Sequence, residues 1–304
     1  MKVAIVIPVY NRKEVTLNCL KAIYENLPGS FHVIMVDSGS TDGTQDVVSE
    51  KYPDTIIIQG KSSEWWTGAI NRGARRAIDL GCQSVLTYND DNVATPGLFA
   101  KLSNTSESHP EAIISSTVCY LEAKDRIYFA GRQRAKLTDR FIYMDLGQNF
   151  TELEGGIREV DLLHGMCTLF PVSVFQTVGW FDESAFPHLF ADDDLILRAK
   201  KAGYRLLVDL EAVVFNDHTM KGLNPYDRRL GMTETISLFT SRKSVFQLST
   251  RTRFLWKHRR SIITFIITWL ADYVRLLCVV LLRRLLSSEI YSKVEKHYLK
   301  IRST

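Results

Sequence analysis

Apolar and polar positions alternate along the first hundred residues with two periods, one typical of strands and one of helices. Short apolar runs predict buried strands, and between them apolar residues recur every three or four positions, which predicts amphipathic helices. The predicted strands are 3–8, 32–36, 55–58 and 84–88, and the predicted helices are 13–26, 41–51 and 68–80. This alternation indicates βαβ units with right-handed crossovers, and therefore a mainly parallel sheet flanked by helices.

The pattern is less regular in the second hundred residues. Strand-like pieces lie near 112–118, 127–130 and 166–170, a helix near 172–178, and two further strands at 204–209 and 212–217. A helix opens at "ADDDLILRAKKAG", where Gly203 is placed to end it. Beyond Pro225 there is no proline and little glycine, which predicts helices. We therefore expect an α/β domain over 1–225 and a helical region over 226–304.

Composition and cysteine usage narrow the class of protein. The chain has 304 residues, of which 45% are hydrophobic, enough for one large domain with an appendage. Its five cysteines have no ligand-like spacing, so we expect reduced thiols of a cytoplasmic protein and neither a disulfide framework nor a zinc site. The first apolar run is too short for a signal peptide.

Charge is distributed unevenly between the two parts. Residues 251–304 hold twelve Lys and Arg against three acids, a balance of +9, which leaves −5 for residues 1–250. Within that basic region, 261–282 is apolar and long enough to cross a bilayer, but Asp272 and Arg275 lie in its middle. Lys257, Ser261, Thr264, Thr268, Asp272 and Arg275 recur at helical spacing as one polar stripe.

This pattern suits a helix that lies on an anionic membrane surface. The alternative is a helix that packs in a core or a dimer with a solvated basic rim. We expect residues 251–304 to bind the inner face of the cell membrane peripherally. No pattern in the chain indicates a nucleic-acid reader, and the oligomeric state stays open, a homo-oligomer included.

Polar stretches follow four of the predicted strands or lie at their ends. In open parallel sheets ligands bind beyond the carboxyl ends of the strands, so the convergence of these stretches predicts a binding site. They are "PVYNR" (8–12), "DSGSTDG" (37–43), "GKSSEWWTG" (60–68) and "NDDN" (89–92). Motifs for a dinucleotide fold and for a P-loop are absent from the sequence.

Two acidic clusters carry candidate chemistry, each with a plainer alternative. Asp90 and Asp91 suit a divalent cation held together with substrate phosphates, or else the N-terminus of the helix near Pro96. The run 192–194 includes more acid than helix capping needs and can supply a general base, although helix-dipole stabilisation explains one or two of the three. His218 follows the last strand and could complete a metal site or be an ordinary surface or core histidine.

The stretch "WWTGAINRG" has a similar ambiguity. Gly68 and Gly73 allow close backbone approach at a helix start, where amide hydrogens favour phosphate. Trp65 and Trp66 are either core residues or a platform for a sugar or base.

Taken in order, these stretches resemble the inverting glycosyltransferases of family 2, which use nucleotide sugars and have the fold called GT-A. "VAIVIPVYNR" resembles the family's first strand, and "VDSGSTDGT" its "DDGSxDGT" segment. "WWTGAINRG" is similar to "GxAxNxG", and "VLTYNDDNVATPGLF" to the Asp-x-Asp strand end. "GWFDE" and "FADDDLILRAKKAGYRL" resemble the acceptor loop and the base helix. The likeness covers residues 3 to about 220, and it implies a nucleotide-sugar half over about 1–100 and an acceptor half over about 101–225.

Carried over by position, the resemblance assigns roles to single residues. Asp91 takes the metal-binding place of the motif with Mg²⁺ or Mn²⁺, His218 completes the site, and Asn89 stands where the family has an aspartate. Asp192 takes the place of the general base, with Asp193 and then Asp194 as fallbacks, and Ala191 replaces the preceding glutamate. The nucleotide-binding positions are Pro8, Tyr10, Asn11, Asp37, Lys61, Gly68, Asn71 and Asp90. The acceptor-binding positions are Trp66, His164, Gly165, Trp180 and Asp182.

The resemblance implies transfer of one sugar, because the Q-x-x-R-W signature of processive members is absent. The donor is a UDP- or dTDP-linked sugar, the "WWTG" form being similar to rhamnosyltransferases of surface polysaccharides. The acceptor is a saccharide or a lipid-linked saccharide. Two alternatives stay open, an inactive glycan-binding relative and a sugar nucleotidyltransferase, although "PVYNR" lacks the Gly-rich loop that the latter needs.

Overall fold

The computed structural model describes residues 1–217 and 230–285, and it divides into two compact units. Unit 1 comprises residues 1–136 and 140–220. Unit 2 comprises residues 221–304 together with Leu137–Asp139, three residues in the turn between two short strands. Each unit is described by itself.

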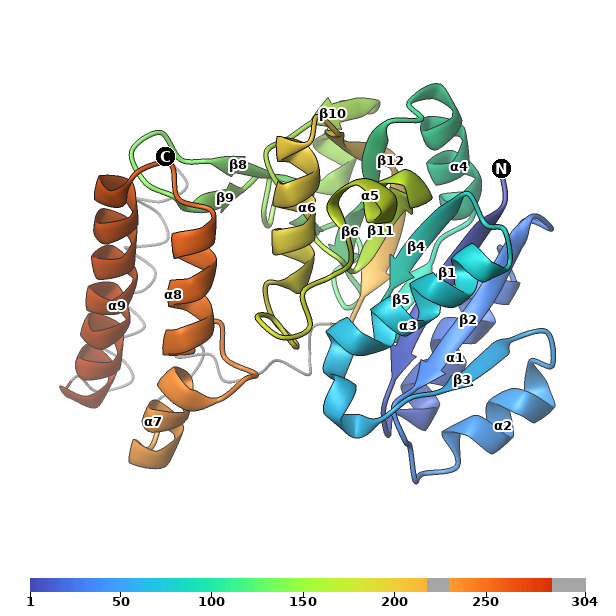
Figure 1. Cartoon of the computed structure of the whole chain (residues 1–304), viewed down its shortest axis with the longest axis horizontal. Helices are drawn as coiled ribbons and strands as arrows, with labels where there is room; N and C mark the ends of the chain where they lie inside the picture. The colour runs from blue at the N-terminus through green and yellow to red at the C-terminus, as the bar shows by residue number, and fades with distance from the viewer. Residues whose placement is uncertain (218–229, 286–304) are drawn as a thin grey trace. The chain divides into compact units, whose positions relative to one another are not determined.

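The first half of unit 1 confirms the predicted alternation of strands and helices (Figure 1). The third helix begins three residues earlier than predicted, at Trp65. The elements are β1 (Val3–Val9), α1 (Lys13–Tyr24), β2 (Phe31–Asp37), α2 (Thr44–Lys51), β3 (Ile56–Gln59), α3 (Trp65–Asp79) and β4 (Ser84–Tyr88), with a 3-10 turn at Ser62–Glu64.

The second half contains more strands than predicted. Its elements are β5 (Asn92–Ala94), α4 (Leu98–Ser108), β6 (Ala112–Tyr120), β7 (Ile127–Phe129), β8 (Arg132–Arg134), β9 (Phe141–Tyr143), β10 (Ile157–Glu159), β11 (Cys167–Pro171), α5 (Val172–Val178), α6 (Ala191–Lys201) and β12 (Arg205–Asn216). The two strands predicted at 204–209 and 212–217 are one strand, β12, with a register shift against β6 between Asp209 and Val213. The expectation of two strands was wrong because a bulge takes up the polar interruption without ending the strand.

The main sheet has the order β10-β12-β6-β11-β4-β1-β2-β3. Strands β1, β2, β3 and β4 run parallel, and Val9 lies opposite Asp37 at their common end. β11 enters antiparallel between β4 and β6. The loops that follow β1, β2 and β4 therefore meet at one edge of the sheet, as the sequence predicted.

Gly73 serves the packing of α3 against this sheet. A Cβ atom on Gly73 would lie 2.2 Å from Val6 Cγ1, so only glycine lets the helix approach β1 this closely. Close approach of backbone is what the sequence predicted for Gly73, but the neighbour is the sheet and not a phosphate.

The described part of unit 2 is helical, which confirms the prediction for those residues. It contains α7 (Met232–Thr240), α8 (Leu248–Lys257) and α9 (Ile262–Leu285). Its own core is formed by Leu230, Leu238, Tyr273, Leu276 and Val280. Within the described residues, α9 alone has the length and composition of a membrane-crossing helix.

Candidate active site

The end of β2 presents a buried carboxylate. Asp37 is 1% exposed, and its Oδ1 accepts a hydrogen bond from the Ser40 backbone at 2.8 Å. Its Oδ2 is buried and accepts no hydrogen bond from the described part of the chain. A buried carboxylate oxygen without a donor is costly, so Asp37 is prepared to accept a hydrogen bond from a ligand.

The loop after β1 holds the loop after β2. Asn11 has a left-handed backbone, φ 51°, and its Oδ1 accepts from the Thr41 backbone at 2.7 Å while its own N–H donates to Ser40 Oγ at 2.8 Å. Tyr10, by contrast, is 51% exposed beside them. Asn11 therefore shapes the predicted nucleotide loop, and Tyr10 presents a free aromatic face to solvent.

A guanidinium meets the two aspartates that follow β4. Arg12 Nη1 lies 2.8 Å from Asp90 Oδ1, and Arg12 Nη2 lies 3.3 Å from Asp91 Oδ2. Asn216, at the end of β12, donates to Asp91 Oδ1 at 2.7 Å. Burial raises the pKa of Asp90 to about 7, although Arg12 lowers it, because desolvation exceeds the attraction.

The helix-capping alternative for this pair is not supported. β5 separates the aspartates from α4, which begins only at Leu98 with Gly97 before it. Both carboxylates instead face the loop after β1, through Arg12.

The fit of this pair to a divalent cation is partial. Among the described residues no group of three or more His, Cys, Asp or Glu could hold a metal. Asn89 Oδ1 already accepts from Trp66 Nε1 at 3.1 Å. Asp90 Oδ2, however, is buried and accepts no hydrogen bond from residues 1–217 or 230–285. Two carboxylates suffice where substrate phosphates complete the coordination, so the residues fit a metal bound together with a diphosphate.

The predicted metal ligand His218 lies outside the described residues. The preceding residue, Asp217, donates its backbone N–H to the Asp91 carbonyl at 3.1 Å.

The three acids of α6 have different partners. Asp193 forms an ion pair with Arg132 of β8, and Asp194 forms one with Arg198 at 2.9 Å. Asp192 has no ion pair in the described chain; its Oδ2 accepts from the Gly165 backbone at 2.7 Å. Of the three, Asp192 therefore has the carboxylate most open to a substrate.

Burial raises the pKa of Asp192 to about 6, and the neighbouring Asp193 adds to the rise, whereas Arg132 lowers it. A carboxyl with this pKa is ionised near neutral pH and is a stronger base than an ordinary aspartate.

The segment His164–Met166 connects Asp192 with the aspartates after β4. A Cβ on Gly165 would lie 2.9 Å from Asp192 Cβ and 2.8 Å from the Trp66 ring, so glycine fits between the two side chains. The next carbonyl, of Met166, accepts from the Asn89 backbone at 3.1 Å and from Asn92 Nδ2 at 2.6 Å. The candidate base and the "NDDN" loop thus flank one three-residue segment.

His164 stabilises this segment through a hydrogen bond and a ring contact. It is 5% exposed, its Nδ1 accepts from the Met166 backbone at 2.8 Å, and its ring lies edge-on to Phe129 at 3.9 Å. Trp66 is edge-on to Phe181 at 5.7 Å. Both predicted acceptor residues therefore contact the framework around Gly165.

Other predicted residues make contacts of their own within unit 1. Buried Asn71 donates to the Phe181 carbonyl and to Glu183, and accepts from the Phe181 backbone. Asp182 Oδ1 accepts from Ala185 N at 2.9 Å and so stabilises its own turn. Trp180 stacks on Phe175 and lies under the Arg75 guanidinium. These three residues shape the loop before α6, and their contacts do not include Asp91 or Asp192.

Pro8 lies within β1, opposite Val36, and Lys61 is exposed at the start of the 3-10 turn. Gly68 lines a cavity of about 330 Å³ along α3. The lining is Ile58, Glu64, Gly68, Arg72, Arg75, Arg76, Asp79 and Glu183, which includes none of the aspartates discussed above.

Sequence reasoning missed the three arginines that pair with the acids. Arg12 was visible within "PVYNR", but its partner loop lies about eighty residues away. Arg132 lies in a short strand that the apolar pattern did not predict. Arg198 was the easiest to find, because it follows Asp194 at the i,i+4 spacing typical of helical ion pairs.

Comparison with known proteins gives a consistent result. Residues 4–179 match the family model described as glycosyl transferase family 2. An N-acetylglucosaminyl-diphospho-decaprenol L-rhamnosyltransferase of Mycobacterium tuberculosis is 26% identical over 191 residues, 57% of this chain and 62% of the relative. A low-salt glycan biosynthesis hexosyltransferase of Haloferax volcanii is 23% identical over 60% of this chain and 57% of the relative. The matches thus span less than two thirds of either relative.

Solved structures show the same fold. A mannosyltransferase of Pyrobaculum calidifontis in complex with GDP-Man and Mn²⁺ has a TM-score of 0.53 at 17% identity, over 90% of this chain and 80% of that one. GalNAc-T7 with UDP, GalNAc and Mn²⁺ has a TM-score of 0.61 at 10% identity, over 90% and 57%. The α/β architecture of this chain is therefore the GT-A architecture.

Proposed function

This chain belongs to glycosyl transferase family 2, and from that premise we propose that it moves one sugar from a nucleoside-diphosphate sugar to a hydroxyl group of a saccharide or lipid-linked saccharide, with inversion. The mycobacterial relative, whose name specifies a diphospho-decaprenol substrate and an L-rhamnosyl group, supports a lipid-linked acceptor and transfer of a rhamnosyl group. We propose a UDP- or dTDP-linked donor, such as dTDP-rhamnose.

One observation carries the proposal. Asp192, which lacks an ion pair among the described residues, and the loop of Asp90 and Asp91 flank the same segment, His164–Met166. A single sugar bound over Gly165 would therefore have the proposed base on one side and, on the other, Arg12 with the aspartates proposed to hold the metal ion.

The donor half of the site uses the sheet edge. We assign the unpartnered Asp37 Oδ2 to an N–H or O–H group of the nucleoside. We assign Asp91 and Asp90 to Mg²⁺ or Mn²⁺, with His218 as a further ligand. When bound, the ion supplies positive charge that stabilises the departing diphosphate. Arg12 adds a fixed positive charge at the same place.

The acceptor half uses α6. Asp192 accepts the proton of the acceptor hydroxyl while the oxygen forms its bond to the anomeric carbon. The bond from that carbon to the diphosphate breaks in the same step, and the electron pair leaves with the diphosphate. A single in-line displacement inverts the carbon and needs no covalent intermediate.

Two matched variants test the assignment. With a panel of UDP- and dTDP-sugars, Asp192→Asn should reduce sugar transfer by about 10²–10⁴-fold while donor-induced thermal stabilisation persists. Asp91→Asn should abolish the part of that stabilisation that depends on Mn²⁺. The surface variant Asp46→Asn serves as the control.

Turnover of the donor at the same rate in EDTA would overturn the metal assignment. Sugar transfer at the wild-type rate by Asp192→Asn would overturn the assignment of Asp192 as the base. Donor binding without turnover in the wild type would favour a glycan-binding relative over an enzyme.

A further inference from the structure

The outer face of α9 is continuously apolar. Every exposed residue between Ile262 and Leu285 has an apolar or thiol side chain. The exposed fractions of the larger ones lie between 41% and 80%. They are Ile262, Ile263, Ile266, Ile267, Leu270, Val274, Leu277, Leu281, Leu282 and Leu285, joined by Cys278. The face is about 36 Å long at 1.5 Å per residue, far beyond the scattered apolar residues of an ordinary surface.

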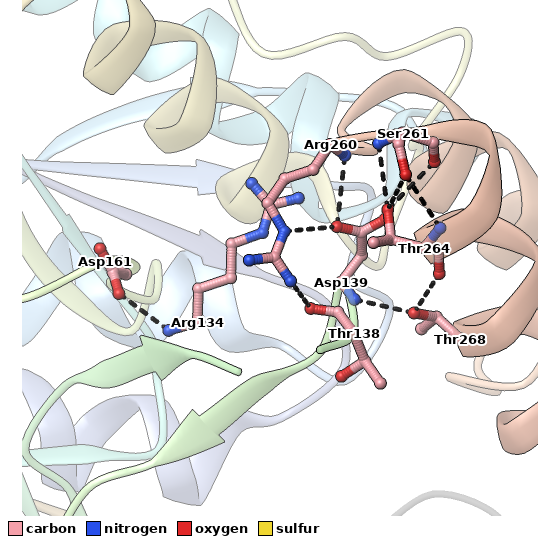
Figure 2. A network of polar contacts seen from close by, with 8 residues as sticks. All are labelled: Arg134, Thr138, Asp139, Asp161, Arg260, Ser261, Thr264 and Thr268. Carbon is pink, nitrogen blue, oxygen red and sulfur yellow. Dashed lines mark hydrogen bonds and ion pairs between the residues drawn. The ribbon is translucent and has the colours of Figure 1, made fainter. Parts of the chain in front are cut away.

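The polar stripe of the same helix faces into unit 2. Figure 2 shows its first part: Thr264 Oγ1 donates to Asp139 Oδ2 at 2.7 Å, and Thr268 Oγ1 accepts from the Asp139 backbone at 2.8 Å. Further along, Asp272 is ion-paired with Arg251 of α8, and Trp269 Nε1 donates to Thr252 at 2.8 Å. Thr264, Thr268 and the charged Asp272 therefore have polar partners inside unit 2.

These contacts favour an α9 that lies on a bilayer over an α9 that crosses it. A crossing α9 would have to leave Asp272 without Arg251 and Thr268 without Asp139, and unpaired groups of this kind are expensive in hydrocarbon. An α9 that inserts only its outer face keeps every one of these bonds.

The charge of unit 2 favours a membrane over a second copy of the chain as the partner of the outer face of α9. Residues 230–285 hold ten Lys and Arg against two acids, a balance of +8. Two such surfaces would repel each other, whereas anionic lipid attracts them, at about 1 kcal/mol for each base near the surface. Arg253 and Lys257 are exposed around the turn between α8 and α9, and Arg260, also exposed there, is ion-paired with Asp139.

The same turn carries an aromatic side chain of the kind found at membrane interfaces. Trp256 is 47% exposed, Arg259 stacks on it at 3.6 Å, and its ring meets Phe265 of α9 edge-on at 5.2 Å. An amphipathic ring next to bases and an apolar helix suits the headgroup level of a bilayer.

We propose that α9 docks unit 2 on an anionic lipid bilayer, with its outer face buried at the level of the headgroups and upper acyl chains and with the bases around Trp256 on the headgroups. The inference rests on unit 2 alone and goes beyond the sugar transfer proposed above.

Vesicle flotation of the full chain tests the proposal. Vesicles of phosphatidylcholine with phosphatidylglycerol should carry the protein, pure phosphatidylcholine should carry at least about tenfold less, and added salt should weaken binding. Ile263→Glu with Leu270→Glu should lower the vesicle partition constant by at least about tenfold. The control Ile142→Glu with Ile157→Glu changes two exposed isoleucines of unit 1 and should bind like the wild type.

Cys278 gives a second readout that does not depend on a substitution. It is exposed, whereas the other four cysteines are buried, so an environment-sensitive fluorophore will label it selectively. Lipids that carry a quencher just below the headgroups should quench the label. Alkaline carbonate should release the protein from the vesicles.

Three results would overturn the proposal. Retention on vesicles after carbonate treatment would mean that α9 crosses the bilayer. A concentration-dependent dimer that the Ile263→Glu, Leu270→Glu pair abolishes, without vesicle binding by the wild type, would mean that a second copy covers the face. Equal binding to neutral vesicles would remove the role of the basic residues. Both double variants with glutamate should turn over the donor like the wild type. Failure of the membrane proposal is therefore distinguishable from failure of the proposed sugar transfer.

Discussion

Single ion pairs decide which of several similar carboxylates is available for chemistry. The sequence alone does not distinguish the three aspartates 192–194. In the structure, Arg132 pairs with Asp193, and Arg198 pairs with Asp194. Asp192 accepts a backbone hydrogen bond from Gly165 and has no ion pair among the described residues. The proposed base, Asp192, thus differs from the other two aspartates in its neighbours and not in its own side chain.

The pH dependence of transfer follows from this arrangement. Asp192 must be ionised to accept a proton, so the rate should rise with pH through about 6 and then level off. Asp193→Asn removes a negative charge that raises the pKa of Asp192, whereas Arg132, which lowers that pKa, stays. The rise of the transfer rate with pH should therefore occur at lower pH in this variant. The transfer rate, measured as a function of pH, reports this shift. Asp145→Asn is the control, because it removes the aspartate of another ion pair, with Arg158.

The same variant tests the alternative base. If Asp193 were the base, Asp193→Asn would lose roughly 10²–10⁴-fold at every pH. We expect a plateau rate close to that of the wild type.

Gly165 is the residue whose space matters most at the site. Gly165→Ala would press a methyl group against Trp66 and Asp192, so we expect a loss of stability of about 1–3 kcal/mol and slower transfer. Denaturant unfolding and the transfer rate measure the two effects. Gly29→Ala, where nothing lies within 4 Å, should change neither; an equally stable and active Gly165→Ala would contradict the assigned packing.

At the scale of elements, the turn between β8 and β9 anchors the start of α9. Asp139 is 3% exposed and accepts from the Arg260 backbone and from Thr264 next to the first turn of that helix, as Figure 2 shows. A carboxylate at this end also favours the helix dipole. Three residues distant in the chain from α9 therefore belong to the same unit.

Asp139→Ala should weaken that anchor. Loss of the buried hydrogen bonds should cost about 1–3 kcal/mol and expose the first turns of α9 to hydrogen exchange. Asp125→Ala, which removes only a half-exposed pair with Arg126, should have little effect. Unchanged exchange at α9 in Asp139→Ala would contradict the anchoring.

At the scale of the whole molecule, the chain has separate cores that we propose to be separate domains. The sheet of unit 1 encloses one, and Leu238, Tyr273 and Leu276 belong to the other. The family model matches residues of the first alone, because it ends at residue 179.

Leu276→Ala tests this independence. Leu276 is fully buried, so its truncation should cost about 2–5 kcal/mol and reduce hydrogen-exchange protection in α7, α8 and α9. Protection of β1, β2 and β4 and the turnover of the donor should not change. The neighbouring Leu277, 49% exposed, provides a control in Leu277→Ala. Parallel loss in both units would argue for one cooperative domain.

Much of unit 1 was predictable because its signals are local. The period of apolar residues predicted β1 to β4 and the helices between them, and the parallel arrangement then placed "PVYNR", "DSGSTDG" and "NDDN" at one edge. The short strands β5, β8, β9 and β10 were not predicted, because three residues are too few for a period to emerge.

By itself the sequence determined the fold class, the strand ends that carry polar residues, and the acids proposed as base and metal ligand. Only the tertiary structure decided which of the three acids has no ion pair among the described residues, that Gly165 lies between Trp66 and Asp192, and that the polar stripe of α9 turns inward. The reason is physical: periodicity reflects burial near each residue, whereas ion pairs and close approaches join segments that lie tens of residues apart.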